Sequence, residues 1–283
     1  MKIMKLRPLF YLLSLSLILM SVFSIWKWKF QVGIDFAGGS LWEIKSEKIK
    51  REDVKKFFEE NKVQVSELSS KNGLISIKSK YLSTVQKATI EKKMKKLDEN
   101  YTELRFASLG ASLGKELVKK TIVAIVLSTL GVLLFVAKAF GDWGFGVSAI
   151  LAMLHDSFIL VGAFSYLGHL FGAEIDALFV TAVLTTLSAS VHDTVVTFDR
   201  IRELRRSDYQ TNLTDLANKA VSETLVRSIN NSTTIIIMLL SLALLGGETT
   251  RWFAVALLVG AVSGTYSSVG VAVPLLLLFK KKK

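Results

Sequence analysis

Two aspartates stand inside long apolar segments, and each directly follows a histidine: Asp156 in LHDS and Asp193 in VHDT. An ionised carboxylate in the hydrocarbon of a membrane costs several kcal/mol unless something pairs with it, and such residues commonly mark ion pathways. We therefore predict an ion-pathway role for Asp193, with a structural carboxylate bonded to nearby hydroxyls as the alternative. For Asp156, a relay role and an interhelical hydrogen bond explain the residue equally well.

The surroundings of Asp193 favour an ion relay. On a helix, Ser190 and Thr197 share its face by i+3 and i+4 spacing, whereas His192 is turned about 100° away. The next apolar segment opens with ETLVRSINNSTT, where the long side chain of Arg227 could extend to the depth of Asp193. Making and breaking an Asp–Arg contact would alternate the carboxylate between ionised and protonated forms. We expect Asp193, Arg227 and Asp156 to form the relay, tuned by His192, Ser190, Thr197 and Asn230.

Simpler explanations exist for several of these residues. Arg227 could be an anchor that obeys the positive-inside bias. His155 and His192 are expected in packing or in hydrogen-bond networks. No metal site is predicted, because adjacent His and Asp side chains point in different directions and no ligand set converges.

The composition indicates a membrane protein. The 283 residues are 51% hydrophobic, and the mean hydropathy of +0.42 is high for a soluble chain. The net charge of +12 comes from a hydrophilic block and from short flanks beside apolar runs, which is not the pattern of a nucleic-acid-binding face. With no cysteine, disulfides and thiolate metal sites are excluded.

Apolar runs long enough to cross about 30 Å of hydrocarbon as helices predict six spans. They cover residues 8–26, 119–138, 146–169, 177–199, 229–246 and 252–279. The first run is too long for a signal peptide and has no small-x-small cleavage site, so we interpret it as an uncleaved anchor with Trp26 and Trp28 at the interface.

The distribution of Lys and Arg predicts the topology. Basic residues gather before the first span, in the 200–227 connection and in the tail from Lys280 to Lys283, whereas the loops FGAEID and GGETTR contain only Arg251. Both termini are therefore expected in the cytoplasm and the 27–118 block outside, since long loops translocate regardless of charge.

The 27–118 block has a regular order of predicted elements. Strands are expected at 40–46, 63–69, 74–80 and 102–109, and helices at 50–62 and from the capping box Ser83–Gln86 to about Asn100. The order βαββαβ predicts a small α+β ferredoxin-like domain. The expected organisation is a first helix (1–26), this domain (27–118) and a five-helix membrane domain (119–283).

The segment GIDFAGGS (33–40) joins the first span to this domain. It is not a dinucleotide-binding fingerprint, because no strand leads into it and no helix follows. Gly38 and Gly39 permit positive φ angles and Asp35 could close a turn, so the simplest interpretation is a tight connection.

Six segments in order resemble the SecF branch of the SecD/SecF protein-export family, within the resistance-nodulation-division superfamily. They are GIDFAGGS, SLGASLGKEL, LHDSFILVG, SVHDTVVTFDRIRE, ETLVRSINNSTT and GTYSSVGVAVPLL. The match runs over nearly the whole chain, and the single small external domain favours SecF over SecD.

The resemblance implies a fold, partners and roles. Six spans would be half of a pseudo-symmetric twelve-helix bundle completed by SecD, in the cytoplasmic (inner) membrane of a prokaryote. Ion flow, of protons or sodium, would move the external domain and assist a preprotein leaving the SecYEG channel, with YajC as a further partner. The family's ion-relay Asp falls on Asp193 and its Arg on Arg227. Its glycine motif, expected to act in coupling, falls on Gly33, Asp35, Phe36, Gly38 and Gly39.

The sequence departs from the family pattern at three positions. His192 replaces an Asn beside the relay Asp, Ala189 replaces a Tyr, and Ala111 replaces a Pro at the entry to the second span. Two alternative functions are an ion-coupled exporter of small molecules or lipids on the same scaffold, and a membrane scaffold without transport. No enzyme, cofactor or nucleic-acid partner is expected, since no nucleophile–base set or nucleotide loop occurs.

Overall fold

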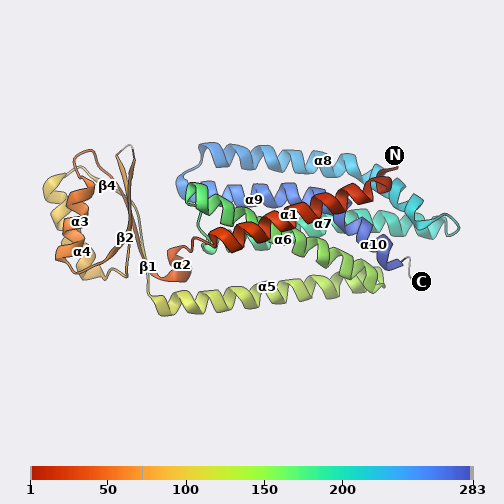
Figure 1. The fold of residues 1–283 in the computed structure, drawn as a ribbon, viewed down its shortest axis with the longest axis horizontal. Coiled ribbons are helices and arrows are strands. Elements are labelled where there is room, and N and C mark those ends of the chain that lie inside the picture. Colours follow the sequence, from red (N-terminus) through yellow and green to blue (C-terminus); the bar gives the residue numbers. More distant parts are fainter. Residues whose placement is uncertain (1, 72, 281–283) are drawn as a thin grey trace. The chain divides into compact units, whose positions relative to one another are not determined.

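The computed structural model describes residues 2–71 and 73–280. Its contacts divide the chain into two compact units: a helical bundle, made of the residues up to Gln31 and from Val123 onward, and a sheet domain, Val32–Ile122. Figure 1 labels the elements of both. Asn72 of the predicted turn and Lys281–Lys283 of the basic tail lie outside the described residues.

The sheet domain has the predicted βαββαβ order. After the short helix α2 (Ile34–Ala37), its elements are β1 (Gly39–Lys45), α3 (Arg51–Glu60), β2 (Val65–Lys71), β3 (Leu74–Ser79), α4 (Thr84–Leu97) and β4 (Thr102–Leu109). The sheet order is β2-β3-β1-β4, with each described neighbouring pair antiparallel. The predicted ferredoxin-like α+β fold is confirmed, and the short helix α2 inside the glycine motif was not predicted.

One hydrophobic core holds the sheet domain together. Alternate residues of the central strands, among them Trp42, Ile44 and Ile77, are buried against Phe58 of α3 and Met94 of α4. This alternation is the period-2 pattern of a sheet with one covered face. The predicted capping box opens α4, because the Ser83 hydroxyl accepts from the Gln86 N–H at 3.3 Å and the Gln86 side chain accepts from the Ser83 N–H at 3.1 Å.

Six helices among the described residues are long and apolar enough to cross a membrane, as predicted. Five of these spans are α1 (Arg7–Trp28, after a 3₁₀ turn at Ile3–Leu6), α5 (Ala111–Phe140), α6 (Trp143–Phe171), α7 (Ala177–Ser207) and α8 (Leu213–Leu245). The sixth comprises α9 (Glu248–Ser267), a π-helical turn (Ser268–Ala272) and α10 (Val273–Lys280). The chain is a multi-pass α-helical membrane protein.

The helices extend well beyond the predicted apolar runs, most of all between the fourth and fifth spans. The predicted 200–227 connection is largely helical, and α7 and α8 are joined across residues 208–212. Charged side chains support these extensions: Arg200 pairs with Glu203 and Arg202 with Asp199, both at i,i+3 spacing. Hydropathy marks only the apolar middle of a helix, which explains the difference.

The core of the bundle lies between α6, α7 and the last span. In the most apolar window of the last span 61% of residues are buried, against 6% in α5, so α5 contributes little to this core. The last span packs closely on α7 at Gly260, because a Cβ there would lie 2.2 Å from Thr186 Oγ1. Larger side chains would push α9 and α7 apart.

The π-helical turn in the last span has a local cause. Pro274 has no N–H, and its ring would clash with the carbonyl of Gly270 in a regular α-helix. A π-helical turn immediately before the proline widens the backbone at this point. Ser267, the last residue of α9, directly precedes the turn.

Candidate functional site

Asp193 lies on α7 and faces α8. Its side chain is half-buried and accepts a hydrogen bond from Ser228 Oγ of α8 at 3.2 Å. Thr197, one turn further along α7, donates to the main-chain oxygen of Asp193 at 3.3 Å and lies 3.4 Å from the hydroxyl of Thr224. The carboxylate thus accepts one hydroxyl from α8, and two threonine hydroxyls lie one turn away along the same interface.

Arg227 and Asp193 line the same cavity, of about 220 Å³, between α7 and α8. The other lining residues are His192, Val196, Thr197, Thr224, Ser228 and Asn231. Within the described part of the chain no ion pair joins Asp193 to Arg227. The exposed guanidinium and the half-buried carboxylate thus face a shared polar space without touching.

Asp156 of α6 has a different environment. It is fully buried and accepts three serine hydroxyls: Ser190 of α7 at 2.6 Å, and Ser263 and Ser267 of α9 at 2.6 and 2.5 Å. His155 Nδ1 lies 3.1 Å from the same carboxylate. Asp156 therefore connects three helices of the bundle core.

The two histidines that precede the aspartates also differ. His155 is buried, and its Nε2 has no hydrogen-bond partner among the described residues. His192 is exposed and lines the cavity that contains Asp193. Among the described residues no group of three or more His, Asp or Glu side chains is arranged to hold a metal ion.

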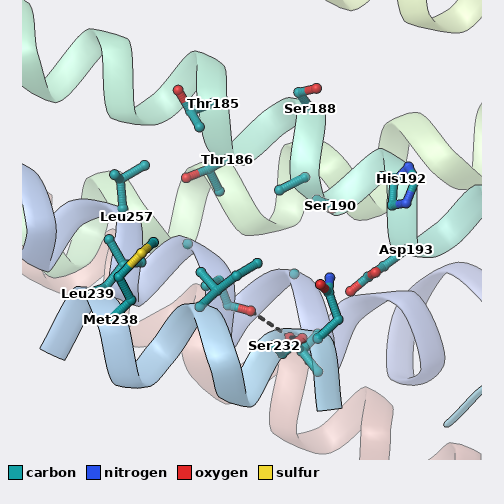
Figure 2. Close-up of a pocket in the computed structure, with 17 residues that line it drawn as sticks. Thr185, Thr186, Ser188, Ser190, His192, Asp193, Ser232, Met238, Leu239 and Leu257 are labelled. Atoms are coloured by element: carbon teal, nitrogen blue, oxygen red, sulfur yellow. Dashed lines mark hydrogen bonds between the residues drawn. The ribbon is translucent and has the colours of Figure 1, made fainter. Parts of the chain in front are cut away.

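A larger cavity, of about 540 Å³, continues from Asp193 between α7, α8 and α9. Figure 2 shows His192 and Asp193 at one end of it and Met238, Leu239 and Leu257 at the other. Ser190, which donates to Asp156, also lines this cavity. The donor to Asp156 thus lies one helical turn from Asp193 on α7 and lines the same cavity.

The glycine motif of the sheet domain makes close backbone contacts. Gly38 and Gly39 have φ angles of 75° and 127°, which side-chain-bearing residues rarely adopt. A Cβ on Gly38 would lie 2.6 Å from Ala111 Cα, and one on Gly114 would lie 2.7 Å from the carbonyl oxygen of Phe36. The motif Gly33–Gly39, including Asp35 and Phe36, thus packs directly on the first turns of α5.

Most of the predicted relay residues lie together. Asp193, Arg227, Thr197 and His192 share one cavity, and Ser190 lies at the next. The exposed Asn230 lines neither of these two cavities, whereas its neighbour Asn231 lines both. Sequence reasoning missed Ser228, Ser263 and Ser267. The stretches RSINN and AVSGTYSS place these hydroxyls on α8 and α9, but which hydroxyl meets an aspartate depends on how the helices pack.

The arrangement suits the binding and release of a small cation. A half-buried carboxylate within a membrane helix can hold a proton or a monovalent cation, and a nearby guanidinium favours the empty, ionised form. No nucleophile–base pair accompanies it at this site.

Known proteins resemble this chain over almost all of its length. Residues 89–282 match the family model of the protein export membrane protein SecD/SecF, C-terminal. The chain is 40% identical to protein translocase subunit SecF of Thermobaculum terrenum, covering 99% of this chain and 94% of that protein. It is 34% identical to the SecF subunit of Sebaldella termitidis, covering 100% and 93%.

Longer proteins match as well. The crystal structure of SecDF, a translocon-associated membrane protein from Thermus thermophilus, superposes with a TM-score of 0.84 at 29% identity, covering 98% of this chain but 38% of that one. Relatives named as protein translocase subunits do not favour the small-molecule exporter alternative. The family match, the near full-length relatives and the six-span bundle show that this chain belongs to the SecD/SecF family of protein export membrane proteins.

Proposed function

We propose that this chain is the ion-driven SecF-type subunit of a protein-export machine. Protons or sodium ions move through the helical bundle, and their passage is coupled to movement of the sheet domain, which assists a translocating preprotein. The observation that carries the proposal is the placement of Asp193 and Arg227 across one polar cavity inside the membrane bundle.

The relay works by alternation at Asp193. The Ser228 hydroxyl stabilises the ionised carboxylate while Arg227 lines the same cavity. Arrival of a cation neutralises the carboxylate, weakens its attraction for Arg227 and changes the packing of α7 on α8. The hydrogen bonds of Asp156 support a positioning role, because they tie α6, α7 and α9 together behind the relay.

The charge distribution and the family membership support a topology and a set of partners. Basic residues at both ends and in the α7–α8 hairpin support cytoplasmic termini and an external sheet domain, in the cytoplasmic membrane of a prokaryote. Relatives in which the two subunits are one chain, such as SecDF of Bacillus subtilis, support SecD as the partner that completes a twelve-helix bundle. SecYEG, YajC and the preprotein are the further partners of the assembly. The glycine motif, which packs against the first turns of α5, is the element that couples ion flow to movement of the sheet domain.

The test is reconstitution of this chain with SecD in vesicles, with proton and sodium conductance measured separately. Asp193→Asn keeps the shape of the side chain and removes its charge, so ion flow is expected to fall to background. Arg227→Ala is expected to reduce it strongly, because the carboxylate then keeps its bound cation.

Matched controls are Asp215→Asn and Arg206→Ala, which alter exposed residues on α8 and α7 outside the cavities. Both should conduct as the unmodified chain does. If Asp193→Asn assembles with SecD and conducts ions as the unmodified chain does, Asp193 is a structural residue and the proposal is refuted.

A further inference from the structure

The short segment that leads from α1 toward the sheet domain, Lys29–Gln31, is bound to the bundle by its own main chain. Gln31 is the last residue of the helical unit before the sheet domain begins at Val32. The carbonyl oxygen of Lys29 accepts a hydrogen bond from Ser165 Oγ of α6 at 2.6 Å, and that of Gln31 accepts one from the Ile175 N–H at 2.8 Å. This segment, the strap, is therefore fixed at both ends to other parts of the bundle.

The strap begins with an unusual backbone conformation. Lys29 has a φ of 58° and a ψ of −153°. Residues other than glycine rarely adopt these angles, and they keep them only where the surrounding contacts enforce them. Here the Ser165 hydroxyl holds the Lys29 carbonyl, and the ring of the preceding Trp28 stacks on His169 of α6 with 4.9 Å between the ring centroids. The contacts with α6 thus set the direction in which the chain leaves α1.

The two attachment points of the strap belong to the helices that carry the aspartates. Ser165 lies on α6 roughly 14 Å from Asp156, at 1.5 Å per residue. Ile175 directly precedes Asp176, whose side chain caps α7 by accepting the Phe179 N–H at 2.8 Å. A displacement of α6 or of the start of α7 would therefore pull on the strap.

Glycines let the turn between α6 and α7 approach the strap closely. A Cβ at Gly168 would lie 2.9 Å from the Ala173 carbonyl oxygen and 3.6 Å from Gln31 Cγ. Gly172, which ends α6, has a φ of 74°, the left-handed conformation that closes many helices. A side chain at Gly168 would force the turn away from its place beside the strap.

The second crossing between the two units is held differently. It lies at Ile122–Val123 within α5, and both residues are exposed. In the most apolar window of α5, among the described residues, only 6% are buried. Movement of α6 and α7 thus has a hydrogen-bonded connection to the sheet domain through the strap, and few contacts with α5 near this second crossing.

We propose that Ser165 is a positioning residue of the coupling mechanism: by holding the strap on α6, it makes the sheet domain follow the helices that carry the aspartates. Rigid helices joined by hydrogen bonds are the kind of contiguous network that carries a displacement between distant sites. The inference rests on the proposed ion-driven function and adds the attachment through which the bundle moves the domain. The glycine motif acts inside the sheet domain, whereas the strap acts on the bundle side.

The test separates ion flow from the work that it drives. The full chain is reconstituted with SecD and the complete SecYEG export system in vesicles, and preprotein translocation is measured with and without an ion gradient, together with ion conductance. Ser165→Ala removes the hydroxyl, and Gly168→Ala displaces the turn. The matched controls are Ser148→Ala, a buried serine of α6 that donates within its own helix to the Gly144 carbonyl at 2.7 Å, and Gly131→Ala, where a Cβ would meet no atom within 4 Å.

In Ser165→Ala the gradient-dependent part of translocation is expected to fall about threefold to twentyfold, the range that one interhelical hydrogen bond contributes in membranes. Gly168→Ala should lower it as well. Ion conductance of Ser165→Ala should equal that of the unmodified chain, because Ser165 lines neither cavity beside Asp193. Hydrogen exchange of the Ile175 amide should be faster in both variants and unchanged in both controls.

The inference is overturned if gradient-dependent translocation by Ser165→Ala equals that of the unmodified chain, whatever the result for Gly168→Ala. It is also overturned if Ser165→Ala loses conductance and translocation together, since the hydroxyl would then be needed by the bundle itself. Neither outcome is the one that refutes the ion relay, which is unchanged conductance in Asp193→Asn. The attachment and the relay can therefore fail separately.

Discussion

Asp156 and Asp193 are single residues of the same type with contrasting surroundings. Asp156 is fully buried, with three serine donors from two neighbouring helices, whereas Asp193 has one side-chain donor and borders two cavities. A carboxylate whose hydrogen-bonding capacity is occupied holds helices together, and one that borders open polar space can exchange a cation. The surroundings, and not the residue type, distinguish the two roles.

Replacing Asp156 is expected to destabilise the bundle. Asp156→Ala leaves the hydroxyls of Ser190, Ser263 and Ser267 without their acceptor. Interhelical hydrogen bonds in membranes contribute roughly 0.6–1.7 kcal/mol each, so a loss of about 2–5 kcal/mol is expected. Thermal unfolding of the full chain in detergent measures it.

The exposed Ser16→Ala on α1 serves as the control for that experiment and should leave the unfolding temperature unchanged. In a double-mutant cycle, Ser267→Ala should cost clearly less in the Asp156→Ala background than in the unmodified chain. Strict additivity would mean that the hydrogen bond does not contribute to stability.

Sequence reasoning located part of this site. Helical periodicity placed Ser190 and Thr197 on the face of Asp193, and the apolar runs placed Arg227 on the following helix. It could not find Ser228, Ser263 or Ser267, because hydroxyls are frequent in α8 and α9 and only the rotation of packed helices decides which of them meet a carboxylate. The same uncertainty affects Asn230, which is predicted at the site although its neighbour Asn231 lines the cavities. Adjacent residues on a helix point 100° apart, and the sequence does not set the rotation of the helix.

At the level of elements, the contact between the glycine motif and α5 predicts a position-specific effect. In Gly114→Ala the new methyl group would lie 2.7 Å from the Phe36 carbonyl oxygen, a backbone atom that cannot move alone. We expect a loss of about 1–3 kcal/mol in local stability, as for other overpacked contacts. Hydrogen exchange of the α2 amides in the full chain reports it.

The same helix provides a matched control. A Cβ at Gly131 would meet no atom within 4 Å, so Gly131→Ala should leave the exchange of α2 unchanged. If both substitutions left it unchanged, the close approach of α2 to α5 would not be a stabilising contact.

The end of α4 predicts a pH dependence of the sheet domain. The Ser46 hydroxyl donates to Asp98 at 2.7 Å, and this hydrogen bond, with one from the Asn100 N–H, holds the pKa of Asp98 below its usual value. The resulting stability is fully present above the unfolded-state pKa of about 3.9 and is lost as the pH falls through the lower folded-state pKa.

Hydrogen exchange of α4 and β1 from pH 7 to pH 2.5, corrected for the intrinsic rate, should therefore show a loss of protection at the acidic end. Asp98→Asn should lower protection at neutral pH and reduce the further loss of protection at acidic pH. Glu52→Gln, at an exposed position of α3, should change neither. If Asp98→Asn loses as much protection at acidic pH as the unmodified chain does, other carboxylates are responsible for that loss.

For the whole molecule, the number of spans and the order of elements in the sheet domain followed from hydropathy and periodicity. Strands are predicted at residues 74–80 and 102–109, where the structure has β3 and β4. In β3 every second residue is buried, because one face of the sheet is covered. The extents of α7 and α8 did not follow, because the last turns of α7 and the first turns of α8 are amphiphilic and carry ion pairs that hydropathy does not register. The π-helical turn before Pro274 likewise depends on backbone geometry.

The sheet domain is inserted into the chain, so the polypeptide passes between the two units twice, at Gln31–Val32 and at Ile122–Val123. Inside the sheet domain the segments next to both crossings, Gly33–Gly39 and the start of α5, pack backbone against backbone. The two ends of the inserted domain are therefore held side by side within that domain, and a pull on either connecting segment is carried by the contact between α2 and α5.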